Sequence, residues 1–248
     1  MQVIVDSLLT AYDILGSGQP VLFLHGWGDN RHGLRPLALS LEGKQTVLLD
    51  LPGFGQTQAP PKAWGLDDYA AFVGDFLKKT EFKPVAIVAH SNGGAIAIRG
   101  LANGSLKTDK LVLLASAGIR DEYTARKKGL KLLAKGAKLL TAPLPKRAKH
   151  KLKRGAYNAI DSELFVAEHL QETFRKIVAD DVMQDAARVN VPVLLVYGSD
   201  DESTPLRYGE KFAAVMPKAE LKVVPGAGHF VHVDEADAVS TYLKDFLK

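Results

Sequence analysis

The chain has 248 residues, 46% of them hydrophobic and 24% charged, as expected of a globular protein with a substantial core. It contains no cysteine, which excludes disulfide bonds and thiol catalysis, and its formal net charge is only +4. No apolar run reaches the roughly 20 residues of a transmembrane helix, and the first residues lack the pattern of a signal peptide, so we expect a cytoplasmic protein.

The predicted elements begin with a pair of short strands around a turn in residues 2–15. Helical patterns such as residues 66–77 would serve as crossovers between the later strands. The later strands are expected in short apolar runs that each close on a glycine-rich or acidic turn, typical of strands buried on both faces: residues 21–24, 46–49, 85–88, 111–114 and 193–197. A further apolar run lies at residues 221–224. The sequence therefore predicts an α/β fold, a doubly wound, mainly parallel sheet of about eight strands.

The strand rhythm stops over residues 118–188, where the sequence becomes helical and polar. We interpret this segment as a helical cap inserted into one core formed by residues 1–117 and 189–248. Thirteen of the 32 Lys and Arg, but only two of the 28 acids, lie between residues 120 and 154. The basic character therefore belongs to the cap, and the rest of the chain is net acidic.

The sequence AHSNGG at 89–94 follows an expected strand and precedes a helical pattern. A strand-to-helix turn this sharp needs small residues two positions before and after its centre, and Ala89 and Gly93 supply them. The motif resembles the nucleophile elbow of the α/β-hydrolase superfamily, with Ala89 in place of the usual first glycine. The resemblance implies that Ser91 is the nucleophile; a helix cap or a phosphate-binding loop remains the alternative for this motif by itself.

Two loops earlier in the chain also resemble this family. HGWG at 25–28 follows the first long apolar run, and the resemblance implies that the backbone amides of Trp27 and Asn92 form an oxyanion hole. The alternative is a tight turn that only requires its glycines, with His25 hydrogen-bonded and Trp27 packed. DLPGFG at 50–55 is interpreted as structural support for the oxyanion loop.

The base is expected in PGAGHF at 225–230, because a neutral histidine is suited to removing the serine proton near pH 7. His229 is preferred over His232, since it comes directly after the strand-end glycines. The pair His229 and His232 also raises the question of metal binding, but a His-x-x-His pair without other ligands favours a surface or structural role for His232.

The acid that orients the base is expected in GSDDESTP at 198–205. The family's usual spacing selects Asp201, whereas Asp200 fits less well and Glu202 should point outward. Acids here would also serve as helix caps. Asp121 is a second candidate, since some members of the superfamily place the acid after the preceding strand.

Together, four motifs at four strand ends occur in the chain order Ser, Asp, His of this fold. The resemblance implies a serine hydrolase that cleaves small-molecule carboxylic esters of small or medium acyl chains through an acyl-enzyme, without metal or organic cofactor. Other activities of the superfamily stay open: lipase, carbon–carbon bond hydrolase, thioesterase, or a ligand receptor with negligible turnover. The sequence assigns no oligomeric state.

In the cap, residues 129–140 place leucines on one helical face and Lys131, Lys135 and Lys138 on the other. We expect the apolar face to cover the active site and the lysines to face water. A sharper hypothesis is weak contact of the basic cap with an anionic membrane. Nucleic acid is not an expected partner, because aromatic residues are scarce there and no nucleic-acid module is present.

Overall fold

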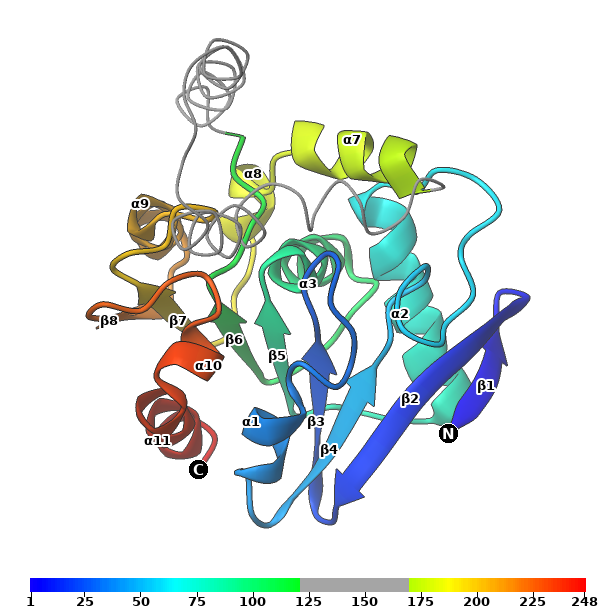
Figure 1. Ribbon diagram of the computed structural model, residues 1–248, viewed down its shortest axis with the longest axis horizontal. Coiled ribbons are helices and arrows are strands. Elements are labelled where there is room, and N and C mark those ends of the chain that lie inside the picture. Colours follow the sequence, from blue (N-terminus) through cyan, green and yellow to red (C-terminus); the bar gives the residue numbers. More distant parts are fainter. Residues whose placement is uncertain (121–169) are drawn as a thin grey trace, which may run out of the picture.

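The computed structural model describes residues 1–120 and 170–248 (Figure 1). Eight strands of the described residues form one sheet in the order β1-β2-β4-β3-β5-β6-β7-β8. Neighbouring strands from β4 to β8 are parallel, and β2 is antiparallel to both β1 and β4. The predicted fold class is confirmed. The strands are β1 (Gln2–Val5), β2 (Leu8–Gly16), β3 (Gln19–Leu24), β4 (Lys44–Leu49), β5 (Ala86–His90), β6 (Lys110–Leu114), β7 (Val193–Gly198) and β8 (Ala219–Val224).

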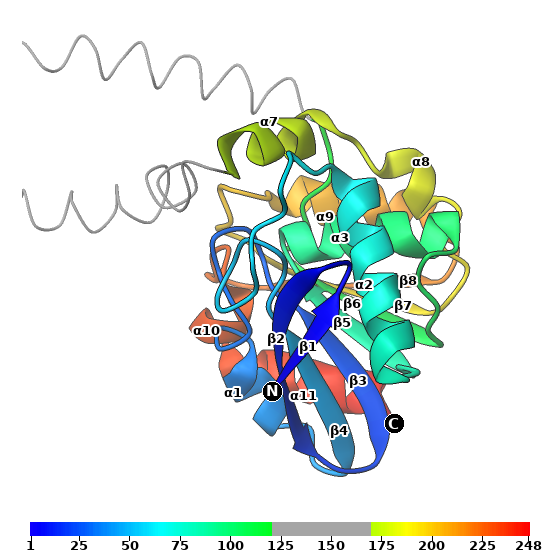
Figure 2. The ribbon, with the colours of Figure 1, turned by 90° about the vertical axis from the view of Figure 1, so that its right-hand side faces the viewer.

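Helices cover both faces of this sheet. Figure 2 shows α2 and α3 on one side of the sheet and α1 and α11 on the other. The helices among the described residues are α1 (Arg35–Leu39), α2 (Leu66–Thr80), α3 (Asn92–Asn103), α7 (Gln171–Ala179), α8 (Met183–Ala186), α9 (Leu206–Val215), α10 (Val231–Asp234) and α11 (Ala236–Phe246).

Alternate residues of the central strands feed two hydrophobic cores. In β5, Ile87 and Ala89 pack with α2 and α3, whereas Ala86 and Val88 pack with α1 and α11. All five residues of β5 are buried, which explains why its sequence reads as a continuous apolar run rather than an alternating one. The strand begins one residue later than expected and continues to His90, which pairs with Leu114 of β6.

The polar motifs lie where the strand order changes direction. From β3, one crossover leads through α1 to β4 on one side, and β5 lies on the other side. In open parallel sheets, ligands bind outside the carboxyl ends of the strands at such a switch point. His25 follows β3 and Ser91 follows β5, so both motifs begin at this point.

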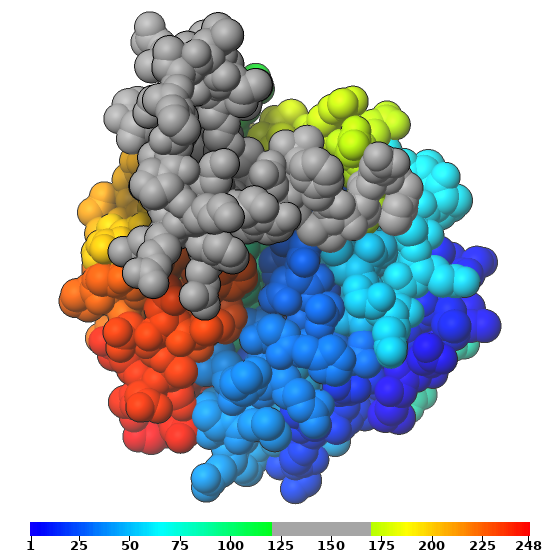
Figure 3. All heavy atoms as spheres, in the orientation of Figure 1, coloured from blue at the N-terminus to red at the C-terminus, as the bar shows by residue number. Residues whose placement is uncertain are grey.

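The last helix of the chain, α11, contacts the residue that ends α1, on the face of the sheet that α1 covers. Figure 3 shows the C-terminal part of the chain, in red, beside the residues that follow β3, in blue. There the Ser240 hydroxyl donates to the Ser40 hydroxyl at 2.8 Å. Residues after the insertion thus complete the same core as residues before it.

Most of the predicted cap falls outside the described residues. The amphipathic segment 129–140, Asp121 and all of the basic segment except Arg120 lie in residues 121–169, so the cap over 118–188 stays a prediction there. Its described remainder contains α7 and α8. In the part of the chain that is described, no helix is long and apolar enough to cross a membrane.

Hydrogen bonds join residues 118–120 to residues 181 and 182, and we call these residues the neck. The Val182 amide donates to the Gly118 carbonyl at 2.8 Å, and the Arg120 amide donates to Asp181 Oδ2 at 2.8 Å. These bonds hold together the residues on either side of residues 121–169. Ile119 and Val182 are buried in the hydrophobic core, so the neck is part of it.

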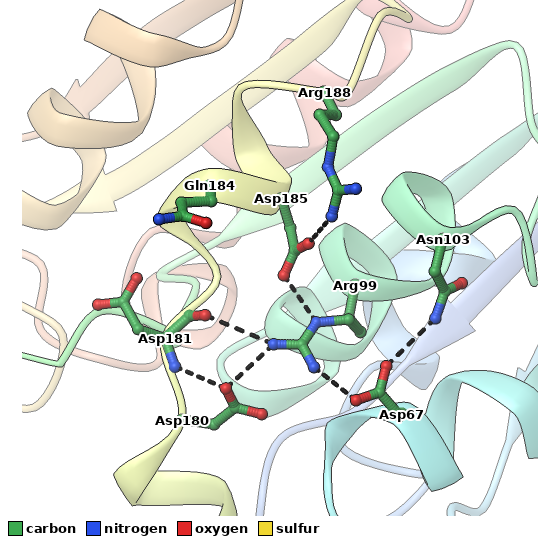
Figure 4. A pocket seen from close by; sticks show the side chains of 8 residues that line it. All are labelled: Asp67, Arg99, Asn103, Asp180, Asp181, Gln184, Asp185 and Arg188. Atoms are coloured by element: carbon green, nitrogen blue, oxygen red, sulfur yellow. Dashed lines mark hydrogen bonds and ion pairs between the residues drawn. The ribbon is translucent and has the colours of Figure 1, made fainter.

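Arg99 of α3 fastens this neck to two helices (Figure 4). Its guanidinium donates to Asp185 at 2.6 Å, to Asp67 of α2 at 2.7 Å and to Asp180 at 3.0 Å. The Arg99 side chain is 13% exposed and that of Asp185 is 8% exposed, so solvent screens this pair weakly. The bonds to Asp185 and Asp180 outweigh the effect of burial and raise the pKa of Arg99.

Replacing this arginine should measurably destabilise the protein. We expect Arg99→Met to lower the free energy of unfolding by about 1–3 kcal/mol, since it leaves Oδ2 of the buried Asp185 without its donor. Urea unfolding measures the change. The control is Lys78→Met, which breaks an exposed ion pair with Asp75 on α2 and should have no measurable effect. Equal midpoints for the two variants would contradict the assigned role of Arg99.

Candidate active site

Ser91 occupies a strained turn between β5 and α3. Its φ of 51° and ψ of −118° lie outside the regions that side chains ordinarily adopt, as expected for a sharp strand-to-helix turn. Three backbone bonds hold the turn: the Ser91 amide donates to Leu114 at 3.0 Å, and its carbonyl accepts from Gly94 and Ala117, each at 3.0 Å. The conformation therefore depends on β6 as well as on local sequence.

The residues around the turn must be small because other backbone lies against them. A Cβ at Gly93 would lie 2.5 Å from the Leu24 carbonyl oxygen, so any side chain there would displace the end of β3. A Cβ at Gly26 would lie 3.0 Å from Ser91 Cβ. The HGWG loop thus lies directly against the elbow. A tight turn that only requires its glycines would not account for this contact with Ser91.

The structure brings Ser91, His229 and Asp201 together, although 138 residues separate the first two in sequence. His229 Nε2 lies 3.0 Å from Ser91 Oγ, and His229 Nδ1 lies 2.9 Å from Asp201 Oδ2. Because a carboxylate only accepts, this contact places the proton on Nδ1 and leaves the Nε2 lone pair facing the serine hydroxyl. That is the arrangement a general base requires.

Asp201 is held by more donors than the base alone. Its side chain is fully buried, and its Oδ1 accepts the amides of Ser203 and Thr204 at 2.7 and 2.9 Å. Thr204 Oγ1 lies 2.7 Å from Asp201 Oδ2 and 3.0 Å from His229 Nδ1. These bonds fix the orientation of the carboxylate. Asp200 and Glu202 are exposed, and Asp200 contacts Ser199 instead.

Sequence reasoning did not select Thr204. The residue stands inside the GSDDESTP motif, where Ser and Thr are ordinarily interpreted as helix caps. Its hydroxyl also lies 2.9 Å from the carbonyl oxygen of Ala115, at the end of β6. A hydroxyl following the acid by three residues was the available signal, but its partner on another strand appears only in the fold.

The HGWG loop is fixed by a buried histidine. His25 Nδ1 lies 2.8 Å from the Gly26 carbonyl, and Nε2 accepts the Leu51 amide at 3.0 Å. The ring is therefore neutral, and burial lowers its pKa. Asp50 accepts the Arg31 amide at 2.7 Å and also pairs with the Arg31 guanidinium. These contacts agree with the supporting function predicted for DLPGFG.

The two predicted oxyanion donors belong to segments that border Ser91. Asn92 is the first residue of α3, and the first amides of a helix have no partner within that helix. Trp27 follows Gly26, the residue whose Cα faces Ser91. Asn92 thus directly follows the serine, at a helix N-terminus that favours negative charge, and an oxyanion hole formed by these two amides stays a prediction.

Aromatic side chains join the oxyanion loop to the return segment of the insertion. The Trp27 ring lies 4.9 Å from that of Phe54 and 5.2 Å from that of Phe174 on α7, measured between ring centroids. The same helix is tied to the core where Thr173 Oγ1 accepts the Trp64 amide at 3.1 Å. The α7 helix is therefore a fixed neighbour of the site.

Two further histidines, His90 and His232, lie close to His229. His90 Nε2 lies 3.0 Å from the His229 carbonyl oxygen, and the rings of His90 and His232 lie 4.8 Å apart. Burial, followed by the nearby His229, lowers the pKa of His90 well below its ordinary value and that of His232 to about 4. His232 is 4% exposed and makes no contact with Ser91 Oγ, which fits the structural role expected for it.

Metal binding finds no support in the described part of the chain. Residues 1–120 and 170–248 contain no group of three or more His, Asp or Glu side chains that could hold a metal ion. His229 and His232 do not act as a pair, because Ser91 and Asp201 already occupy both ring nitrogens of His229.

Comparison with known proteins identifies the family. Residues 21–241 match the model of the alpha/beta hydrolase family, so the chain belongs to this family. A 2-hydroxy-6-oxo-6-phenylhexa-2,4-dienoate hydrolase from Burkholderia cepacia is 27% identical over 94% of this chain and 88% of that protein. A solved serine hydrolase involved in carbazole degradation is 25% identical, with a TM-score of 0.75 over 100% of this chain and 97% of its own. An esterase from Exiguobacterium antarcticum shares the fold, with 20% identity and a TM-score of 0.75 over 99% of this chain and 98% of its own.

The buried His232 predicts a loss of stability in mild acid. Its pKa falls from 6.5 to about 4 on folding, so between these values the unfolded chain binds a proton that the folded protein does not. Stability should therefore decrease as the pH falls from 6.5 to 4, and His232→Phe should reduce this decrease by up to about 3 kcal/mol.

Urea midpoints between pH 4 and 7.5 measure the effect. The matched control is His32→Gln, which alters an exposed histidine and should leave the slope of stability against pH unchanged. A His232→Phe slope equal to that of the wild type would show that this histidine is protonated alike in both states.

Proposed function

From membership of the alpha/beta hydrolase family and the geometry at Ser91, we propose that this protein is a serine hydrolase that cleaves carboxylic esters of small or medium acyl chains. One observation carries the proposal: a single imidazole lies 3.0 Å from the Ser91 hydroxyl and 2.9 Å from a buried carboxylate. Ser91 is the nucleophile, His229 the base, and Asp201 the acid that orients and stabilises it.

The first half-reaction forms the acyl-enzyme. Ser91 Oγ bonds to the ester carbonyl carbon as its proton passes to His229 Nε2. The carbon–oxygen bond to the alcohol then breaks, and His229 gives the proton to the departing oxygen. In the second half-reaction a water molecule replaces the alcohol: His229 takes its proton, the hydroxide bonds to the acyl carbon, and the proton returns to Ser91 Oγ as the acid leaves.

Charge develops on the carbonyl oxygen in both half-reactions. The amides of Trp27 and Asn92 are proposed to donate to this oxygen, and fixed donors of this kind contribute about 3–4 kcal/mol each to lowering the barrier. Asp201 stabilises the positive charge on His229 at the same stage. The amides of Ser203 and Thr204 and the ring of His229 hold its two oxygens, so its orientation is set before that charge develops.

A carbon–carbon bond hydrolase is the second candidate, favoured by the Burkholderia relative and the carbazole-degradation enzyme. Ester cleavage expels an oxygen that His229 is able to protonate, so it needs no group beyond those described. Carbon–carbon cleavage expels a carbon anion, which requires a substrate whose neighbouring groups delocalise the charge. The described groups therefore favour esters. Because two relatives favour the second activity, carbon–carbon cleavage is included in the substrate panel below.

The function is tested first by covalent labelling. A fluorophosphonate probe should label the wild type but not Ser91→Ala, and Ser91→Ala should reduce kcat/KM for p-nitrophenyl esters by at least about 10³-fold. Ser17→Ala is the control, because Ser17 is exposed in the turn between β2 and β3. Equal labelling of wild type and Ser91→Ala would refute the serine mechanism.

A substrate panel then separates the two candidates. We expect the highest kcat/KM for one of the esters p-nitrophenyl acetate, butyrate and octanoate. A 2-hydroxy-6-oxo-dienoate, whose cleavage is measured as a loss of absorbance, should be turned over more slowly. A dienoate turned over faster than every ester would replace the proposed activity with carbon–carbon hydrolysis. Binding without turnover of either class would indicate a receptor.

A further inference from the structure

The backbone around His229 needs support from outside its own loop. His229 lies between β8 and α10, just after Gly226 and Gly228, and glycines leave the unfolded backbone more freedom than other residues. The Gly228 amide donates to Asp234 Oδ2 at 2.8 Å, and the Ala227 carbonyl accepts the Asp200 amide at 3.0 Å. Neither contact reaches the elbow that carries Ser91.

His90 supplies that connection. Its Nε2 lies 3.0 Å from the carbonyl oxygen of His229, across 139 residues of sequence. Two adjacent residues of the elbow therefore contact the same residue of the loop: Ser91 meets the ring of His229, and His90 meets its backbone. A ring attached at both points has less freedom to move away from the serine than a ring attached at one.

We propose that His90 is a positioning residue, whose Nε2–H donates to the His229 carbonyl and so sets the distance between the base and the Ser91 hydroxyl. This inference rests on the proposed function for its catalytic consequence, but the bond itself does not. The residue touches no reacting atom, and it acts through His229.

The hydrogen bond fixes the state of the His90 ring. A carbonyl oxygen only accepts, so the proton lies on Nε2 and Nδ1 is bare. Burial, followed by His229, His232 and then His25, lowers the pKa of His90, and the ring stays neutral at pH 7. Neutrality suits this position, since His229 gains a proton during the reaction and a second cation with ring centroids 4.9 Å apart would oppose it.

Packing alone does not account for an imidazole at this position. His90 is 1% exposed, and its Nδ1 has no hydrogen-bond partner within residues 1–120 and 170–248. Burying an unpaired ring nitrogen costs free energy that an apolar side chain of similar size would avoid. The bond to His229 is the described polar contact that offsets this cost.

A pair of variants tests the donor separately from the ring. His90→Gln keeps an N–H at the reach of Nε2, whereas His90→Met has similar length and no donor. We expect His90→Met to lower kcat for the best ester by about 10- to 100-fold with KM changed less than about twofold, because a misplaced base slows the chemical step. The Gln variant should keep kcat within about fivefold of the wild type. His90→Leu replaces Met if that variant does not fold.

The control is His232→Phe, which removes a neighbouring buried imidazole that does not bond to the His229 backbone, and it should leave kcat within about twofold. Equal kcat for His90→Gln and His90→Met, whether both high or both low, would overturn the proposal. A fall in kcat for His232→Phe as large as for His90→Met would do the same, since packing would then explain both.

Amide hydrogen exchange provides a readout that needs no turnover. His90→Met should speed exchange over residues 226–231, and His90→Gln should not, while exchange in β5 stays unchanged in both. If no ester is cleaved and Ser91 is not labelled, the proposed function fails but this comparison still decides the inference. Identical exchange in the two variants would refute the connection between His90 and the loop.

Discussion

The backbone conformation of Ser91 is the constraint on which the rest of the site depends. A non-glycine residue at φ 51° and ψ −118° costs about 1–3 kcal/mol, and it persists only where the surroundings impose it. Here the surroundings are the end of β6, which accepts the Ser91 amide, and the end of β3, which leaves no space for a side chain at Gly93. The turn places the hydroxyl at the switch point of the sheet and begins α3 directly after it. His229 and the HGWG loop both lie against this residue.

The sequence predicted the fold, and it selected the three side chains that the structure brings together, because both follow from local order along the chain. Buried parallel strands appear as apolar runs, and chemistry-bearing residues come directly after them, so Ser91, Asp201 and His229 could be selected before any contact was known. Thr204 and His90 stood inside the same motifs and were not selected. Their partners lie on other strands and loops, at Ala115 and at the His229 carbonyl, and no spacing within one motif encodes a contact across 89 or 139 residues.

Local sequence patterns also did not predict how the residues before and after residues 121–169 are attached to the core. Composition marked where the strands stop and resume, but the residues that fasten the return segment belong to other parts of the chain. Arg99 is a charged residue in the helix that begins after Ser91, and only the fold shows that it joins α2, α3 and the neck at Gly118 and Val182. With Phe174 against Trp27, the same segment reaches the oxyanion loop. Helix α3 thus follows Ser91 directly and also holds the residues that return to the core after residue 169.

The costs in this structure are concentrated around the serine. Besides the strained turn, several buried side-chain atoms near Ser91 have no hydrogen-bond partner among the described residues. They are both ring nitrogens of His232, Nδ1 of His90, and the side-chain amide nitrogen and oxygen of Asn92. Buried polar atoms without partners are rare in folded proteins, and each costs about 1–3 kcal/mol. Strands β3, β5 and β6, almost wholly buried, supply the stability that tolerates such a group of atoms. The uncharged imidazoles of His90 and His232 lie beside one another, and His90 contacts His229, so part of this cost is incurred next to the candidate active site.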